Sequence, residues 1–306
     1  MAYSSGGLIE ATDYNNLING SNQLNTVWGV GSGSAGYGQT AVSAVAATNT
    51  VTATQWASLV NTLNNARTHQ SGAGSGISAP TAGTTITYLA TLQTAVNTSY
   101  SSRLSAATQG TLATTTLTGY NITGGTGAFS GTKALTFTWA SGNAARYFFN
   151  CGGSIGWNIT GVTNNNGTLR SADLVTNLAT NLKGGVMTNS ASSYTGTGGA
   201  TRTTNSYGYW NLLTTNQLGS QVYSSNYRYE YNSDYTNFNL KTSTVNVGGN
   251  GDNGLQITVT IGWTMATTYV GLNDAVDVTM AWNGTYTPPE TTYLTASWGA
   301  PTIAAV

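Results

Sequence analysis

The spacing of hydrophobic residues changes partway along this chain, from a helical period to a strand period. Up to about residue 110, apolar side chains recur every three or four residues, as on one face of an amphipathic helix. From about residue 133, short aromatic and β-branched runs alternate with Gly, Asn, Ser and Thr clusters, which is typical of strands and turns. This change predicts an α+β fold, with N-terminal amphipathic helices followed by an antiparallel β-sandwich-like region that contains one inserted helix.

The N-terminal helices are expected over residues 8–28, from Thr52 to about residue 71, and from about residue 84 to residue 107. The second has the clearest signals, because Thr52 and Gln55 have the spacing of a capping box and a Gly72–Gly76 cluster marks its end. Since Thr and Asn on the other faces are poor helix formers, packing must stabilise these helices. We interpret the narrow apolar stripe of the second helix as an oligomer interface around a shared axis; it consists of Trp56, Leu59, Val60 and Leu63.

Domain boundaries follow the change in pattern. We expect a helical assembly region over residues 1–110, a low-complexity linker over 111–132 and a β-rich domain over 133–306. In the β-rich domain, Ser171 is expected to cap a helix that Lys183 and Gly184 close. The predicted strands are Lys133–Ala140, Arg146–Asn150, Ser154–Thr160, Tyr207–Leu213, Gln221–Tyr231, Tyr235–Val247, Leu255–Met265, Val276–Trp282 and Thr291–Trp298.

Charge is scarce in this sequence, and its scarcity limits the partners. Only 6% of residues are charged, nine basic and nine acidic, against about a quarter in an average soluble domain. The basic residues stand apart from one another, so no cluster is present to neutralise the phosphates of a nucleic acid. A surface with so little net charge has little electrostatic protection against association. We therefore expect a protein that works as a homo-oligomer and does not bind nucleic acid.

The cysteine count and the hydropathy indicate whether disulfides, a secretory signal or a membrane span are expected. Cys151 is the only cysteine, which excludes an intrachain disulfide; we expect it to be a small buried hydrophobe beside Phe149, with an interchain bridge or a reactive thiol as the minor alternative. The first residues lack the basic and apolar regions of a secretory signal, and no apolar run approaches the ~20 residues of a membrane span.

Candidate catalytic and metal-binding residues are few. The only histidine, His69, is expected to cap the C-terminal end of the second helix, where the helix dipole favours a cation. The acidic residues give no recognisable glycosidase pair, so hydrolysis of a polysaccharide is a minor alternative. Asp252, Asp274 and Asp277 lie in segments with oxygen ligands for Ca²⁺, but turn chemistry explains these segments better. We therefore expect no catalytic residue, no cofactor and no metal site.

Aromatic residues form the most prominent candidate surface. Tyr and Trp bring a large contact area at low entropic cost, both to sugar stacking and to subunit interfaces. The sequence therefore predicts either a glycan platform or an interface, of which part must be core. The residues concerned are Trp210, Tyr223, Tyr227, Tyr229, Tyr231 and Tyr235.

Two blocks of sequence resemble structural proteins of tailed bacteriophages, especially phages of cyanobacteria. The second block, Ala145–Gly153, is similar to the aromatic strand-turn of those virion proteins. The resemblance touches about half the chain and does not extend beyond about Gly161. The first block consists of Ala11–Leu17, Val27–Gly29, Gly36–Gln39, Val51–Ala53, Gln55–Trp56 and His69–Gln70.

The resemblance implies a non-enzymatic virion protein that assembles into a particle appendage, commonly a trimer, such as a tail or neck fibre. It implies partners among other virion proteins and synthesis in the host cytoplasm without a signal peptide, and it supplies no catalytic or binding residues. Two other classes of function stay open at this point. One is a carbohydrate-binding receptor module that contacts host surface glycans, and the other is a self-assembling extracellular filament or surface-layer subunit.

Overall fold

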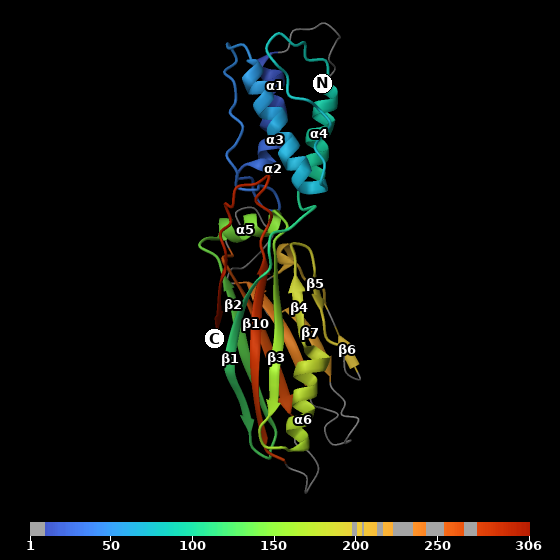
Figure 1. The fold of residues 1–306 in the computed structure, drawn as a ribbon, viewed down its shortest axis with the longest axis vertical. Coiled ribbons are helices and arrows are strands. Elements are labelled where there is room, and N and C mark those ends of the chain that lie inside the picture. Colours follow the sequence, from blue (N-terminus) through green and yellow to red (C-terminus); the bar gives the residue numbers. More distant parts are fainter. Residues whose placement is uncertain are drawn as a thin grey trace.

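The computed structural model describes residues 10–197, 201–203, 205–212, 217–222, 235–242, 254–265 and 274–306. The expected α+β fold is confirmed (Figure 1). Four helices form one end of an elongated molecule, and two antiparallel sheets form the other end. A further helix, α5, lies between them. The order of these parts along the chain therefore matches the change from helical to strand periodicity.

The helical end contains α1 (Ala11–Ile18), α2 (Leu24–Trp28), α3 (Ala53–Ser71) and α4 (Leu89–Ser101). The single helix expected over residues 8–28 is in fact two short helices, because the chain turns at Gly20, whose φ of 119° suits only glycine. The helix expected over 84–107 is real but shorter at both ends. The capping box of α3 is confirmed, since Thr52 and Gln55 each accept a hydrogen bond from the backbone N–H of the other.

The extended segment that contains Val42 and Val45 lies along α1 and α2, and two asparagine side chains hold it there. The amide of Asn15 donates to the carbonyl of Val45 at 2.7 Å and accepts from its N–H at 2.9 Å. The amide of Asn25 makes the same pair of bonds with Val42, both at 2.8 Å. Both asparagines therefore satisfy backbone groups that no strand partner satisfies.

The apolar stripe of α3 is buried inside a single chain, which corrects the expectation of an oligomer interface. Trp56 is 3% exposed, and Leu59, Val60 and Leu63 are fully buried. The ring of Trp56 meets the ring of Tyr14 edge to face, with centroids 5.2 Å apart. The prediction was wrong because α1, α2 and α4 of the same chain supply the apolar partners that we assigned to other subunits.

The β-rich end consists of two antiparallel sheets. One has the strand order β1-β10-β3-β4-β5 and the other β11-β2-β9-β8-β7-β6. The strands are β1 (Ala113–Gly124), β2 (Phe129–Thr138), β3 (Ser154–Asn164), β4 (Gly184–Met187), β5 (Ser192–Tyr194), β6 (Thr201–Thr203), β7 (Gln217–Val222), β8 (Tyr235–Thr242), β9 (Gln256–Met265), β10 (Val276–Thr287) and β11 (Thr302–Ala305).

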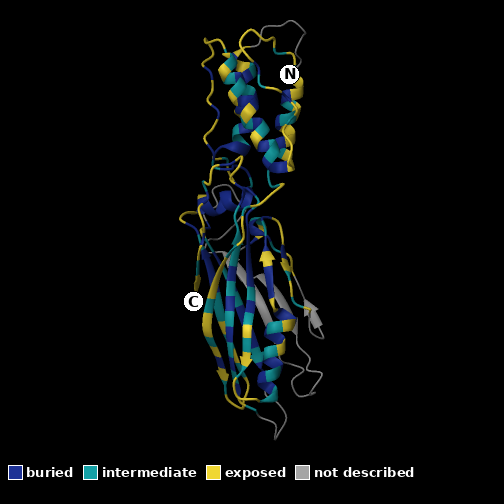
Figure 2. Ribbon diagram, viewed as in Figure 1, coloured by how far each residue is buried: buried dark blue, intermediate teal, exposed yellow. Residues whose placement is uncertain are grey.

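The core of the sandwich lies between the two sheets, and alternate residues of β9 and β10 are buried in it (Figure 2). Ile257, Val259 and Ile261 of β9 are fully buried and alternate with partly exposed residues. Trp157 of β3 and Trp282 of β10 are among the largest fully buried side chains. This alternation is the period-2 pattern that the sequence shows over residues 255–261.

The expected linker over residues 111–132 is wrong. Residues 113–124 form β1, and residues 129–132 begin β2. The uncharged Thr-rich composition that we interpreted as low complexity suits a strand, because threonine is β-branched. The two strands lie in different sheets, so this segment joins the two layers of the sandwich.

The aromatic stretch Arg146–Asn150 is helical, which corrects the strand predicted there. It belongs to α5 (Gly142–Asn150), and the hydroxyl of Ser141 caps this helix by accepting from the N–H of Ala144 at 3.1 Å. Aromatic residues occur in helices as well as in strands. Here the N-cap at Ser141 and the burial of all sides of the segment favour the helix. The strand expected from Ser154 is confirmed as β3.

The inserted helix is confirmed as α6 (Leu169–Thr176), which continues as a π-helix, η1 (Asn177–Leu182). Its cap is Thr168, not Ser171, because the Thr168 hydroxyl accepts from the N–H of Ser171 at 3.2 Å. The segment closes at Lys183, as expected, with a φ of 55°. Together α6 and η1 pack against β3, β10 and β8, so they close one side of the sandwich.

The remaining strand predictions had mixed outcomes. Residues 207–213 include a short 3₁₀ helix, η2 (Tyr209–Asn211), instead of a strand. No strand forms over residues 291–298. The next strand after β10 is β11, which begins at Thr302. Strands β8, β9 and β10 lie where the sequence placed strands, although β10 runs five residues further, to Thr287. Strand β7 shares only residues 221 and 222 with the strand predicted over Gln221–Tyr231. The predicted extensions over 223–231 and 243–247 lie outside the described residues.

The burial of the α3 stripe predicts a loss of folding stability when it is truncated. Leu59→Ala should lower the free energy of unfolding by about 2–5 kcal/mol, because it leaves a cavity in the helical core. Denaturant unfolding followed by circular dichroism measures this change, with Ser58→Ala at an exposed neighbouring position as the control. Dissociation of an oligomer without loss of stability would instead support the subunit interface.

Candidate functional site

The most elaborate polar arrangement of the described chain lies where the helical end meets the sandwich. We call it the junction, and it consists of Tyr37, Gln39, His69, Gln70, Arg146, Asn150 and Glu290. These side chains come from four parts of the sequence: the loop after α2, the end of α3, α5 and the segment after β10. All seven are buried, by at least 93% of their surface. Buried polar groups of this kind require partners, and the junction supplies nearly all of them.

Tyr37 is the centre of the junction. Its hydroxyl donates to the carbonyl of Arg103 at 2.9 Å and accepts from the amide of Gln70 at 2.8 Å. Its carbonyl accepts from Gln39 at 3.0 Å and from the hydroxyl of Ser297 at 2.9 Å. Burial raises the pKa of Tyr37 far above its ordinary value, so this phenol does not ionise. Tyr37 therefore joins the helices to the C-terminal segment as a neutral residue.

Two amide side chains extend these contacts in opposite directions. Gln70, at the end of α3, donates to the carbonyl and the hydroxyl of Ser99 in α4, at 2.9 and 3.2 Å. Gln39 forms a reciprocal pair with the backbone of Thr295, donating to its carbonyl and accepting from its N–H, each at 2.8 Å. The second pair joins residues 256 positions apart in the sequence.

Arg146 and Asn150, on neighbouring turns of α5, hold the glycine-rich loop after α2. The guanidinium of Arg146 donates to the carbonyls of Ala35 at 2.6 Å and Val30 at 2.8 Å. The amide of Asn150 donates to the carbonyl of Gly36 at 3.1 Å. Gly36 has a φ of 98°, and a Cβ atom there would collide with the carbonyl of Val30. The loop thus needs glycine to bring its carbonyls close to α5.

His69 and Glu290 form an ion-pair-like contact, with Nδ1 of the imidazole 3.0 Å from Oε1 of the carboxylate. The other carboxylate oxygen accepts from the backbone N–H groups of Thr292 and Tyr293. Burial lowers the pKa of His69 below its ordinary value, although the hydrogen bond and the charge of Glu290 act in the opposite direction. Nε2 of His69 is buried and has no hydrogen-bond partner among the described residues.

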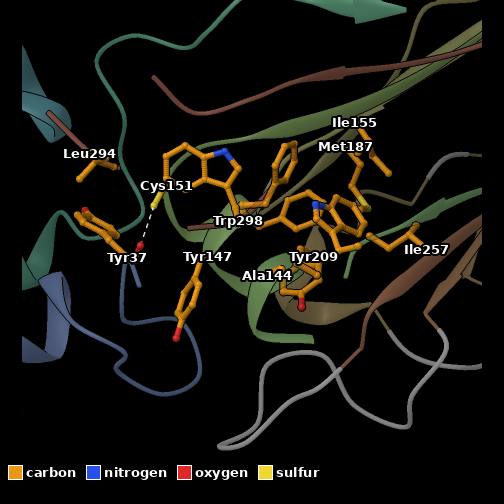
Figure 3. Close-up of a cluster of buried hydrophobic side chains, with 14 of the residues drawn as sticks. Tyr37, Ala144, Tyr147, Cys151, Ile155, Met187, Tyr209, Ile257, Leu294 and Trp298 are labelled. Atoms are coloured by element: carbon orange, nitrogen blue, oxygen red, sulfur yellow. Dashed lines mark hydrogen bonds between the residues drawn. The ribbon is translucent and has the colours of Figure 1, made fainter. Parts of the chain in front are cut away.

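An aromatic and aliphatic cluster surrounds the polar contacts of the junction (Figure 3). The rings of Phe149 and Tyr209 stack, with centroids 4.3 Å apart. Cys151 is fully buried, and its Sγ lies 3.9 Å from the carbonyl of Tyr37. Burial raises the pKa of the Cys151 thiol well above its ordinary value, so it stays protonated. This confirms the expectation of a buried, hydrophobe-like cysteine.

The predicted aromatic surface is only partly described. Tyr223, Tyr227, Tyr229 and Tyr231 lie outside the described residues, as does the side chain of Tyr235. Trp210 is half-buried: its Nε1 donates to the amide of Asn150 at 3.1 Å, and its ring meets that of Tyr209 edge to face. Trp210 therefore belongs to the surroundings of the junction.

The predicted acidic residues have local partners where they are described. The backbone carbonyl of Asp274 accepts from Arg170, and a carboxylate oxygen of Asp277 accepts from the amide of Asn165 at 2.8 Å. Asp252 lies outside the described residues. Within the described ranges, no three His, Cys, Asp or Glu side chains are grouped so that they could hold a metal ion.

Sequence reasoning missed most of the junction. His69 was expected to cap α3, and it does lie in the last turn of that helix, but its partner Glu290 is 221 residues away. Tyr37, Gln39 and Arg146 carried no signal that single-sequence patterns provide. The one clue was the resemblance, since three of its segments contribute to the junction; they are Gly36–Gln39, His69–Gln70 and Ala145–Gly153.

Comparison of the chain with protein-family models, with curated proteins and with solved structures gives no match. No relative therefore assigns a role to any junction residue. Among the described residues, no helix is long and apolar enough to cross a membrane. Chemically, the junction can bind and position parts of its own chain, because its donors and acceptors are directed at one another.

The pKa of His69 predicts that acid destabilises the fold. Because the folded-state pKa is lowered, the unfolded chain binds a proton at His69 first as the pH falls below about 6.5. Stability should be fully present above that pH and fall below it, with a slope of up to about 1.4 kcal/mol per pH unit, until the folded-state pKa is reached. Denaturant unfolding between pH 7.5 and 5 measures the slope.

The matched control for this pH dependence is His69→Gln. Since His69 is the only histidine, the variant should lose most of the slope between pH 7 and 5.5, whatever its stability at pH 7.5. An unchanged slope in the variant would assign the acid sensitivity to carboxylates instead.

The contacts of Arg146 predict a marked effect of a change that conserves charge. Arg146→Lys should lower the free energy of unfolding by roughly 2–4 kcal/mol, because an ammonium cannot reach the separate carbonyls that the planar guanidinium reaches. Limited proteolysis should then cleave within residues 30–38 faster. Arg67→Lys, at a half-buried position with a hydrogen bond to Gln70, is the control and should change little. Equal effects of the two variants would contradict a special role of Arg146.

Proposed function

We propose that this protein is a non-enzymatic structural protein of a tailed-phage virion, an oligomeric subunit of a tail or neck appendage. The observation that carries the proposal is the position of the sequence blocks that resemble such proteins. Gly36–Gln39, His69–Gln70 and Ala145–Gly153 are far apart in the sequence, yet all three converge on the junction. Three of the seven segments that carry the resemblance therefore meet at one buried site.

The shape of the molecule supports the same proposal. An appendage subunit must transmit force between its attachment and its far end, which favours an elongated body without a free hinge. Here the helical end and the sandwich lie at opposite ends, and the junction between them is buried and hydrogen-bonded (Figure 1). In this proposal one end of the molecule attaches to other virion proteins.

The chemistry of the described residues supports a structural role over an enzymatic one. His69 is 1% exposed and hydrogen-bonded to Glu290, so no substrate can reach it in this structure. Cys151 is fully buried as a thiol. The exposed surface is instead rich in uncharged hydroxyl and amide groups, which suit close packing between subunits.

Sedimentation velocity of the full chain over a concentration series tests the proposal. We expect a discrete oligomer whose mass does not change with concentration; the resemblance favours a trimer, and another closed oligomer would keep the proposal while changing its symmetry. Open-ended polymers would favour a filament or surface-layer subunit, and a monomer at all concentrations would overturn the assembly argument. Immunogold labelling of phage particles with an antibody against the chain then locates the appendage.

A further inference from the structure

The four edge strands of the sandwich differ greatly in length. Among the described strands, the edges are β1 and β5 in one sheet and β11 and β6 in the other. Strands β5 and β6 have three residues each and β11 has four, whereas β1 has twelve. Very short edge strands are a common protection against unwanted pairing. Strand β1 lacks this protection.

The first half of β1 is also exposed and uncharged. Thr114, Thr115 and Thr116 are all exposed, although successive residues of a strand point to opposite faces. Leu112, directly before the strand, is 59% exposed. Residues 111–132 contain no charged residue and no proline, the side chains that natural edge strands use to prevent pairing. A bulge between Leu117 and Tyr120 interrupts the strand only after this stretch.

The opposite side of the same sheet is covered, so β1 is the only long open edge of this sheet among the described strands. There, β4 pairs with residues 155–158 of β3, and α6 with η1 packs along the rest of that strand. On the β1 side, the described part of the chain contributes only the short strand β11 of the other sheet, which ends beside the 78% exposed Val306 (Figure 1). Among the described elements, no helix covers β1.

We propose that a second copy of this chain pairs its own β1 with this edge, so that the sheet continues from one subunit into the other. A two-fold axis perpendicular to the sheet would relate the two strands in antiparallel orientation. In the register centred on Thr115, each Thr114 faces Thr116 of the second copy, and each Ala113 faces Leu117. Cross-strand Thr–Thr pairs and apolar pairs of this kind stabilise antiparallel sheets.

A second copy fits this edge better than a partner of other chemistry. The stretch Leu112–Leu117 offers no charge for an acidic or basic peptide to recognise and no aromatic ring for a sugar to stack on. The five residues Ala113–Leu117 are nearly symmetric about Thr115, with an apolar residue at each end and three threonines between, so this stretch complements itself in antiparallel pairing. This contact does not depend on the proposed function. Because it has two-fold symmetry, it produces a dimer when no other contact between subunits is present.

The test is to place charge on the edge and measure the mass. The double variant Thr114→Lys, Thr116→Lys brings lysines opposite lysines in the proposed register, and like charges directly opposite destabilise a sheet. We expect self-association of the full chain, measured by sedimentation velocity, to weaken by roughly tenfold or more. The control is Thr91→Lys, Thr98→Lys, at exposed positions of the α4 region, which should associate like the unmodified protein.

A second measurement keeps the test independent of any loss of stability. In the proposed register, Thr115 lies opposite Thr115 of the second copy, so Thr115→Cys should form a disulfide-linked dimer under mild oxidation. The natural Cys151 is fully buried and does not interfere. Thr163→Cys, exposed on β3 of the same sheet, is the matched control and should stay uncrosslinked.

The outcomes separate this inference from the proposed function. Loss of association with the edge lysines, together with the Thr115 crosslink, supports pairing through β1. A trimer or an open polymer that the edge lysines leave unchanged would overturn this contact while leaving an assembled structural protein in place. A monomer at every concentration would overturn both.

Discussion

The structure depends on a buried cation and the carbonyls that surround it. Arg146 is 3% exposed, and an arginine removed from water is tolerated only where oxygen acceptors replace its hydration. The loop after α2 supplies them, and it can do so because glycines let its backbone turn toward α5. Once this loop is fixed, Tyr37 within it has a defined place, and the ends of α3 and α4 are positioned through its hydroxyl. The Arg146 guanidinium therefore helps to hold the helical end against the sandwich, together with the contacts of Gln39 and Glu290.

Local signals in the sequence predicted the local structure well. The capping box at Thr52 and Gln55 gave the start of α3, and the alternation over residues 255–261 gave β9 and its buried face. Such signals work because capping and strand alternation involve residues close together in the chain. Where composition conflicted with geometry, prediction failed: the Thr-rich segment of β1 was interpreted as a linker, and the aromatic run of α5 as a strand.

The candidate site could not be predicted in the same way, since its bonds join distant residues. Nothing at His69 indicates Glu290, and nothing at Gln39 indicates Thr295, because a buried pair is defined by the fold that brings its members together. The α3 stripe shows a related difficulty, because an apolar helix face does not indicate which surface will cover it. Trp56 and Leu59 had to be buried, but the sequence did not show whether their own chain or another subunit would cover them.

The contacts of the C-terminal segment also have a consequence for synthesis. During translation, the helical residues leave the ribosome long before Glu290 and Thr295 exist, so His69 and Gln39 must wait for partners more than 200 residues downstream. The helices can form early, but the junction closes only after Glu290 and Thr295 have been synthesised. A chain that stops before Glu290 would lack the contacts of His69 and Gln39 and would keep only those that α5 makes with the loop after α2.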